Sequence, residues 1–227
     1  MTLTEFISKI EKIENLTQDV KRIIFSCPSN FSFKAGQYVS VKCAKHDETK
    51  WRSYSILNPP REKGVIHICI KIVPGGFASD IFESAKKGED FILRGPIGHF
   101  IFDEEFKGEH IFIATGTGVT PFYSMIKEFA DKGKNMTLIF GVRNKDNLFF
   151  HDEFQEIEKN HPNFKYIPTL SRDEWSGMTG RVQKHIPENI NGKLFYACGL
   201  KEQVLETVEL LLKRGVPKEN IRKERYS

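Results

Sequence analysis

Two rhythms of hydrophobic and polar residues divide the chain near residue 106. Before this point, short apolar stretches alternate with turn residues, most clearly at 65–73, where isoleucine occupies every second position and predicts a half-buried strand. Similar stretches, rich in β-branched and aromatic residues, are 6–13, 20–25 and 38–42. Closely spaced strands of this kind predict an antiparallel barrel, and helical spacing between Gly76 and Gly88 adds one helix.

After residue 106, apolar runs alternate with longer helical stretches, which predicts a parallel sheet covered on both faces. The runs are 111–114, 136–142, 164–170 and 194–198, and the helical stretches are 120–132, 151–159 and 201–214. The last helix shows an apolar stripe and should end at Gly215. That stripe consists of Val204, Leu205, Val208, Leu211 and Leu212. A short strand at 219–224 would then return the chain to the edge of the sheet.

Composition narrows the class of protein. Hydrophobic residues make up 39% and charged residues 28% of the chain, as in ordinary globular proteins. The excess of 34 Lys and Arg over 30 Asp and Glu is too small to indicate nucleic-acid binding, although it permits an acidic partner. No apolar run approaches the roughly 20 residues of a membrane span, and the first residues lack the pattern of a secretory signal. We therefore expect a cytoplasmic location and no membrane contact.

The four cysteines, at positions 27, 43, 69 and 198, are widely scattered and form no C-x-x-C pair. This spacing argues against a zinc site, a disulfide framework or an iron–sulfur cluster held by this chain alone. We expect no metal.

The segment 111–125 carries the first candidate site. An apolar run enters a turn with Gly116 and Gly118, and Pro121 stands in the first turn of the following helix. Such a turn lets the backbone approach a ligand closely, and the helix N-terminus attracts a phosphate. The turn is not the complete dinucleotide fingerprint, because Pro121 replaces the third glycine. The alternative is an ordinary strand-to-helix turn, which could need two glycines in any parallel α/β protein.

Arg52, Ser53, Tyr54 and Ser55 form a second candidate site. On a strand, Arg52 and Tyr54 would project to one side, and the two serines to the other. A guanidinium suits a pyrophosphate, a phenol ring can lie against a flat heterocycle, and a hydroxyl can hydrogen-bond a ring nitrogen. The alternative is a tyrosine packed on the barrel beside a surface arginine.

A third motif, residues 74–79, opens the single helix of the barrel. Its glycines and helix start predict a second phosphate cradle made of backbone N–H groups. The alternative is an ordinary glycine-rich turn with Ser79 as the N-cap.

These motifs occur in a fixed order, together with Phe33-x-x-Gly36-Gln37-Tyr38 before them, Gly95-Pro96-Ile97-Gly98 between them and Cys198-Gly199 near the end. As an ordered set covering nearly the whole chain, they resemble the ferredoxin–NADP reductase superfamily. The resemblance implies a six-stranded antiparallel flavin-binding barrel at residues 1–103, followed by a five-stranded parallel NAD(P)-binding domain at 104–227.

The resemblance also implies roles for individual residues. Arg52 would hold the FAD pyrophosphate, Tyr54 would stack on the isoalloxazine, and Ser55 would hydrogen-bond near flavin N5. The implied FAD-binding residues are Arg52, Ser53, Tyr54, Ser55, Gly76, Phe77, Ala78 and Ser79. The implied NAD(P)-binding residues are Thr115, Gly116, Thr117, Gly118, Thr120, Pro121, Cys198 and Gly199, with Cys198 and Gly199 beside the nicotinamide.

The C-terminal segment is similar to the acidic-then-aromatic ending of bacterial ferredoxin or flavodoxin–NADP reductases. By this likeness Tyr226 would cover the flavin face that nicotinamide must reach, and Glu224 joins Ser55 and Cys198 as a candidate catalytic residue. A frayed terminus is the alternative.

Four further residues predict a preference for NADPH. Ser171 and Arg172 follow the third parallel strand, Arg181 lies nine residues further on, and Arg143 follows the second strand in place of a carboxylate. Guanidinium groups and a hydroxyl match a 2′-phosphate. The acidic residues at 173 and 174 argue in the opposite direction.

The resulting hypothesis is a monomeric reductase that takes a hydride from NADPH onto FAD and passes single electrons to a ferredoxin or flavodoxin. Two alternatives remain open. One is an NAD(P)H:flavin reductase that supplies reduced flavin to a partner enzyme, and the other is a non-enzymatic nucleotide-binding protein.

Overall fold

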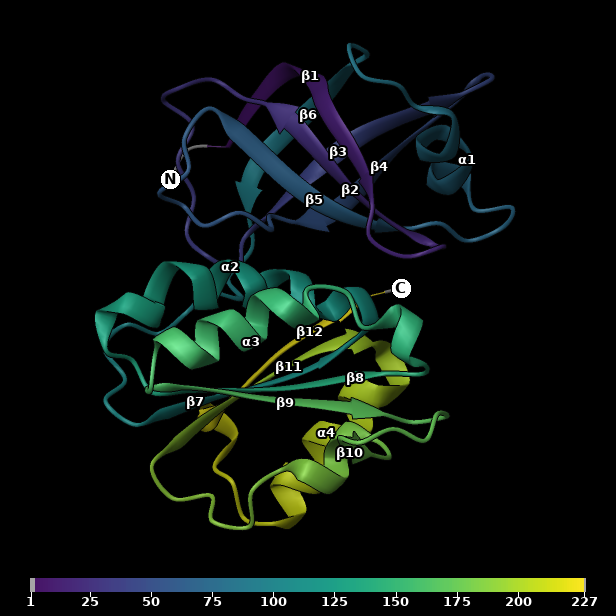
Figure 1. Cartoon of the computed structure of the whole chain (residues 1–227). Helices are drawn as coiled ribbons and strands as arrows, with labels where there is room; N and C mark the ends of the chain where they lie inside the picture. The colour runs from purple at the N-terminus through teal and green to yellow at the C-terminus, as the bar shows by residue number, and fades with distance from the viewer. Residues whose placement is uncertain (1–2, 227) are drawn as a thin grey trace. The chain divides into compact units, whose positions relative to one another are not determined.

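The computed structural model describes residues 3–226, which divide into two compact units (Figure 1). The first unit contains the chain up to Phe102 together with Tyr123–Glu128, and the second contains Asp103–Phe122 and the chain from Phe129 onward. Each unit carries its own six-stranded sheet and its own buried core.

The first unit is an antiparallel barrel of six strands, the number expected from the sequence. In chain order they are β1 (Thr4–Asn15), β2 (Val20–Ser26), β3 (Tyr38–Lys45), β4 (Glu48–Ser55), β5 (Val65–Lys71) and β6 (Asp90–Ile97). Their order in the sheet is β4-β3-β6-β1-β2-β5. The outer strands meet through an isolated bridge between Ile56 and Ile68, just beyond the end of β4. Along its own length β4 therefore lies at an edge of the sheet.

Alternation of side chains explains the core of the barrel. Ile66, Ile68 and Ile70 of β5 face inward and are at most 2% exposed, as the isoleucine periodicity predicts. Helix α1 (Phe77–Ser84) adds Phe82, whose ring stacks on Phe91 with 5.3 Å between centroids. Burial of Phe82 thus fixes α1 against the barrel.

The second unit contains six parallel strands rather than the five expected. In chain order they are β7 (Glu109–Thr115), β8 (Met136–Val142), β9 (Phe164–Leu170), β10 (Met178–Thr179), β11 (Lys193–Leu200) and β12 (Ile221–Tyr226), arranged as β10-β9-β8-β7-β11-β12. The additional strand, β10, has two exposed residues, which are too few to produce a hydrophobic period. Its pairing with β9 comes from the path of the preceding loop.

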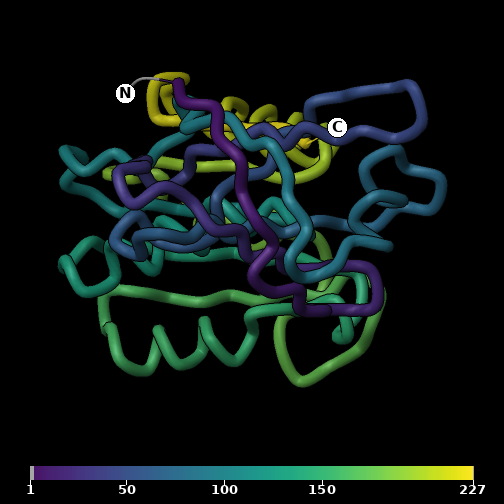
Figure 2. Tube along the Cα trace, turned by 90° about the horizontal axis from the view of Figure 1, so that it is seen from above, coloured from purple at the N-terminus to yellow at the C-terminus, as the bar shows by residue number. Residues whose placement is uncertain are grey.

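The helices of the second unit follow the predicted alternation. Helix α3 (His151–Asn160) and helix α4 (Lys201–Lys213) cover opposite faces of the sheet (Figure 1). In the Cα trace α3 lies beside β9 (Figure 2), and the rings of Phe154 and Tyr166 lie 5.2 Å apart between them. Aromatic packing therefore attaches α3 to the outer half of the sheet.

One part of the predicted stripe on α4 is wrong. Val204 and Leu211 are fully buried, whereas Leu205 and Leu212 are 41% and 46% exposed. The face that meets the sheet is centred on Val204, Thr207 and Leu211, all of which are fully buried. Leu205 and Leu212 therefore lie at its margin. The helix ends at Lys213, and Gly215 follows in a left-handed conformation with φ 85°, as expected.

Short 3-10 turns complete the two units. They are η1 (Gly116–Val119), η2 (Ala130–Lys132), η3 (Lys145–Asn147), η4 (Val182–His185) and η5 (Lys218–Asn220), and η1 leads directly into α2 (Thr120–Phe129).

Within residues 3–226 no helix has the length and apolar character needed to cross a membrane. The same residues contain no group of three or more His, Cys, Asp or Glu side chains arranged to hold a metal. No disulfide joins the four cysteines at positions 27, 43, 69 and 198.

Candidate functional site

The motif at residues 52–55 occupies the end of β4. Arg52 pairs with Val41 and Tyr54 with Val39 on β3, and both partners are fully buried. Arg52 and Tyr54 therefore lie on the inward side of the edge strand, and Ser53 and Ser55 on the outward side. The strand expected for this motif is confirmed.

Tyr54 rests on the barrel core. Its ring meets Phe82 of α1 edge to face, with 5.9 Å between centroids. Burial raises the pKa of the Tyr54 phenol well above its ordinary value, the neighbouring Cys43 raises it further, and Arg52 opposes the shift. The phenol therefore stays neutral at physiological pH and offers a flat ring with one hydroxyl.

Arg52 and the N-terminus of α1 come together, although 24 positions separate Arg52 from Gly76 in the sequence. The exposed Arg52 side chain donates a hydrogen bond to the carbonyl of Trp51 at 3.1 Å, and its guanidinium carbon lies 6.0 Å from the centroid of the Phe77 ring. Phe77 is the first residue of α1. The arginine and the first helical turn thus converge at one end of the barrel.

The turn before α1 is shaped by Ser79. The Ser79 hydroxyl accepts a hydrogen bond from the Val73 N–H at 2.9 Å, and the Gly76 N–H donates to the Val73 carbonyl at 2.9 Å. The N-cap of the helix is Gly76, so the alternative interpretation of Ser79 as N-cap is wrong. Amide groups in the first turn, at Phe77 and Ala78, have no acceptor within the helix. They are the amide groups for which the sequence predicts phosphate binding.

The loop after β4 is rigidified by Asn58, which sequence reasoning did not identify. This buried side chain donates to the carbonyl of Val65 at 3.2 Å and accepts from the His67 N–H at 2.8 Å. Ser55, three residues earlier, is 4% exposed and pairs with Tyr38 across the sheet. Because Asn58 ties this loop to β5, the position of Ser55 is well defined.

A pocket of about 820 Å³ lies on the opposite, outward face of β4. Its lining includes Lys34, Ser53, Arg94 and His99, and the described lining contains no Asp or Glu. The guanidinium carbon of Arg94 lies 4.1 Å from the Trp51 ring centroid, a cation–π contact. Sequence reasoning did not identify this cationic pocket, although two of the sequence motifs contribute to its lining through Gln37, Tyr38, Pro96, Ile97 and Gly98.

In the second unit, the glycine turn packs directly on the end of β11. Gly116 has φ 53°, a conformation that favours glycine, and the space around it is open. A Cβ at Gly118 would collide with the carbonyl of Cys198 and lie 2.6 Å from the Gly199 Cα. The first glycine therefore serves the turn and the second permits close packing.

The remaining turn residues hold the start of α2. The buried Thr120 donates through its hydroxyl to the Thr117 carbonyl at 2.7 Å, and Pro121 is buried in the first helical turn. Thr115, at the end of β7, donates to the Gln203 side chain at 3.0 Å. Gln203 was absent from the sequence-based set of candidates.

Three candidate residues meet at the ends of β11 and β12. The parallel register places Cys198 opposite Glu224 and Leu200 opposite Tyr226. Burial raises the pKa of the Cys198 thiol well above its ordinary value, the nearby Glu224 carboxylate adds to this shift, and a hydrogen bond with the Tyr226 side chain opposes it. The thiol is therefore neutral. The structure thus brings Cys198 together with Glu224 and Tyr226, which lie more than 20 residues later in the sequence.

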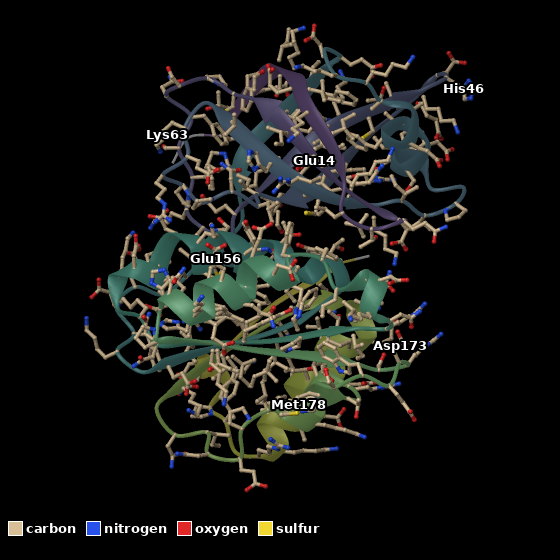
Figure 3. All side chains as sticks on the ribbon, in the orientation of Figure 1. Glu14, His46, Lys63, Glu156, Asp173 and Met178 are labelled. Carbon is tan, nitrogen blue, oxygen red and sulfur yellow. The ribbon has the colours of Figure 1, made fainter. Side chains whose placement is uncertain are left out.

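The residues expected at a 2′-phosphate lie along the carboxyl edge of the sheet. The Arg172 N–H donates to the Arg143 carbonyl at 3.0 Å, and the Ser171 N–H donates to the Val142 carbonyl at 3.0 Å. Asp173, labelled in Figure 3 on the loop that leads toward Met178, accepts a hydrogen bond from the Lys145 N–H at 2.9 Å. The Asp173 carboxylate is thus held by the loop backbone. It is therefore a weaker argument against a phosphate at this edge than its position in the sequence suggests.

For Arg181, the position of the backbone agrees with the sequence-based prediction, but the partner of the side chain does not. Its neighbour Gly180 donates to the Leu170 carbonyl at 2.7 Å, so the backbone returns to the end of β9. The Arg181 side chain, however, forms an ion pair with Glu206 of α4 at 3.0 Å. Both side chains are more than half exposed, so this pair is weak.

Known proteins resemble this chain along nearly its whole length. The Oxidoreductase FAD-binding domain family matches residues 8–102, and the Oxidoreductase NAD-binding domain family matches residues 112–209. The phenol hydroxylase P5 protein of Acinetobacter pittii (strain PHEA-2) is 28% identical over 98% of this chain and 65% of its own length. Ferredoxin--NADP reductase B of Sorangium cellulosum (strain So ce56) is 29% identical over 97% of both chains. The chain thus spans just under two thirds of the Acinetobacter relative.

Solved structures share the fold. The Amycolatopsis cytochrome P450 reductase GcoB superposes with a TM-score of 0.90 at 25% identity, over 98% of this chain and 70% of that one. A ferredoxin NADP+ reductase from Neisseria gonorrhoeae, solved with bound FAD and NADP, gives a TM-score of 0.86 at 22% identity, over 97% of this chain and 98% of that one.

An antiparallel barrel with a glycine turn before its helix, followed by a parallel sheet with a second glycine turn, defines a class: oxidoreductases with separate FAD-binding and NAD-binding domains. Within that class, this chain belongs to the ferredoxin–NADP reductase superfamily, as its sequence motifs suggested. It therefore combines an FAD-binding domain with an NAD-binding domain, and its cofactors are FAD and a nicotinamide nucleotide.

Proposed function

We propose that this chain takes a hydride from NADPH onto FAD and delivers single electrons to a ferredoxin or flavodoxin. The observation that carries this proposal is that each unit has its own glycine turn leading into a helix, with Arg52 beside the start of α1 in one unit and the Gly116–Gly118 turn against β11 in the other. Bound FAD would supply the conversion between hydride and single-electron chemistry. The protein supplies binding and orientation.

In the barrel, Arg52 and the first turn of α1 would bind the FAD pyrophosphate. Tyr54 would present its ring to the isoalloxazine, and its neutral phenol supports such stacking. Ser55 would donate its hydroxyl near flavin N5. The hydrogen bonds that Asn58 makes to Val65 and His67 support this role, because they restrain the loop directly after Ser55.

In the parallel sheet, the turn from Thr115 to Pro121 would bind the nucleotide pyrophosphate, and Cys198 with Gly199 would lie beside the nicotinamide. Glu224 and Tyr226, which meet Cys198 at the sheet edge, would complete this end of the site. The neutral thiol supports a role in contact and orientation, because it adds no charge beside the ring.

The 2′-phosphate would lie at the neighbouring sheet edge, near Arg143, Ser171 and Arg172. The two hydrogen bonds between the loops that carry these residues support NADPH as the preferred nucleotide.

The pocket on the outward face of β4 supports an acidic redox partner. Lys34 and Arg94 bring positive charge to this face, no acidic residue contributes to the described lining, and Ser53 of the flavin-binding motif forms part of the wall. One relative is named the reductase component of a phenol 2-monooxygenase, a name that supports electron transfer to another protein rather than to a small molecule.

The absorption spectrum of the purified protein tests this function. We expect flavin bands at about 380 and 450 nm that bleach on anaerobic addition of NADPH and return when oxidised ferredoxin or flavodoxin is added. A protein that loses its flavin during purification but reduces added flavin would instead be an NAD(P)H:flavin reductase. A colourless protein that does not bind added FAD would contradict both enzymatic functions.

A further inference from the structure

The edge strand β4 carries a second cation beside Arg52. We propose that Lys50 binds the FAD pyrophosphate together with Arg52, and that Glu48 competes with the cofactor for this lysine. The inference rests on FAD binding by the barrel and extends the site to two residues that no motif identifies.

Strand geometry places Lys50 on the correct face. Lys50, Arg52 and Tyr54 occupy alternate positions of β4, so their side chains project to the same side. Lys50 pairs with the buried Cys43, just as Arg52 pairs with the buried Val41. Because β4 is an edge strand, the two long side chains can extend past the sheet toward α1.

The Lys50 and Arg52 side chains both reach the ring of Phe77. The Lys50 ammonium lies 4.5 Å from the centroid of the Phe77 ring, and the Arg52 guanidinium carbon lies 6.0 Å from the same centroid. Phe77 is the first residue of α1, which has eight residues and Gly76 as its N-cap. An ammonium, a guanidinium and the positive end of a helix therefore surround one small region.

The charge of the ligand matches this arrangement. A pyrophosphate diester carries two negative charges, whereas Arg52 supplies only one positive charge. Lys50 supplies the second within reach of the same helix terminus. Lysine acts as a point charge and arginine as a planar fork, so the two can bind different oxygens of one pyrophosphate.

The carboxylates near the cradle have their own cationic partners. Asp80, in the first turn of α1, would repel a phosphate, but Lys45 forms an ion pair with it at 2.5 Å. Glu48 forms an ion pair with Lys50 at 2.8 Å, with 64% of the Glu48 side chain and 40% of the Lys50 side chain exposed. Such an exposed pair is weak, so a pyrophosphate can replace Glu48 as the partner of Lys50.

Release of FAD from the holoprotein tests the proposal. The FAD dissociation constant can be measured from the recovery of flavin fluorescence on dilution. Lys50→Ala should weaken FAD binding about tenfold, the lower end of the range for a charge-assisted contact, because Lys50 is partly solvated. Lys50→Arg keeps the charge and should stay within about twofold of wild type.

Glu48→Gln should do the opposite and tighten FAD binding about two- to threefold, because it releases Lys50 from an exposed ion pair. The double variant Glu48→Gln/Lys50→Ala should bind like Lys50→Ala alone. Lys9→Ala is the matched control, since Lys9 belongs to the same barrel and forms an exposed ion pair with Asp90 at 2.9 Å. It should bind FAD like wild type.

Equal FAD affinity in Lys50→Ala and Lys9→Ala would overturn the role of Lys50. A double variant that binds more tightly than Lys50→Ala would overturn the competition, because Glu48 would then act without Lys50. Failure of the wild-type protein to bind FAD would instead remove the proposed function, so the two failures are distinguishable.

Discussion

The two turns proposed to bind anions differ in what surrounds their glycines. In the barrel, the charged groups beside the turn are the Arg52 and Lys50 side chains on an edge strand, and a Cβ at Gly76 would lie 2.8 Å from the Ser79 hydroxyl and 2.9 Å from the Val73 carbonyl. In the sheet, a Cβ at Gly118 would collide with the Cys198 carbonyl and lie 2.6 Å from the Gly199 Cα, in the main chain of β11. The barrel contacts involve a side chain and the turn after β5, which can adjust to a substitution, whereas the Gly118 contacts can be relieved only by moving a strand.

The largest expected effect is a loss of stability at low pH, to which one buried histidine in each unit contributes. Burial lowers the pKa of His67 in the barrel and of His110 in the sheet to about 4 in each case. The unfolded chain binds a proton at each site near its ordinary value of 6.5, so the unfolded state holds more protons between pH 6.5 and 4. Stability should therefore be complete above pH 6.5 and fall as the pH approaches 4, by on the order of 3 kcal/mol for each histidine.

Urea unfolding at several pH values checks this loss. His110→Phe should remove the contribution of the sheet, since a phenyl ring can keep the contact with Phe106, whose ring centroid lies 5.5 Å away. His67→Gln should remove the contribution of the barrel. An unfolding free energy that stays constant from pH 7 to 4.5 in the wild-type protein would contradict the prediction.

The second prediction compares the two glycines. Gly118→Ala should lower the unfolding free energy by about 2–3 kcal/mol and abolish binding of 2′,5′-ADP, because the added methyl collides with the Cys198 carbonyl. Gly76→Ala should cost less, about 1 kcal/mol, because its φ of −74° suits alanine and its close contacts, at 2.8 and 2.9 Å, are with the Ser79 hydroxyl and the carbonyl of Val73 in a turn rather than with a strand. Thermal unfolding and isothermal titration measure both effects. Similar losses in the two variants would show that the distinction between contacts in a turn and contacts in a strand is wrong.

The smallest expected effect concerns the nucleotide preference within the sheet. Arg172→Ala should reduce kcat/KM for NADPH by about tenfold, with little change for NADH, because a lost contact to a charged phosphate costs roughly 1.5 kcal/mol or more. Arg181→Ala should cost less, because its side chain already has Glu206 as a partner. Steady-state kinetics with both nucleotides decide this, and equal losses with NADPH and NADH would remove the case for 2′-phosphate recognition.

Much of the architecture was accessible from local pattern. The isoleucine alternation at 65–73 predicted a strand with one buried face, and the structure buries Ile66, Ile68 and Ile70. The alternation of runs and helices after residue 106 predicted the parallel sheet, and the order of motifs identified the superfamily. These features depend on neighbours in sequence, because strand and helix periods arise within a few residues.

The tertiary structure decided what depends on distant pairings. Strand β10 forms because the loop after β9 brings the chain back alongside β9. The contact of Arg181 with Glu206 depends on where α4 packs. Lys50 gains its importance only from the distance to Phe77, and Cys198 meets Glu224 only through the register of β11 with β12. The sequence by itself determined which residue types were available and where most of the strands and helices lie. Which side chains meet was decided by sheet register and helix packing, since these bring together residues whose separation along the chain leaves no local pattern.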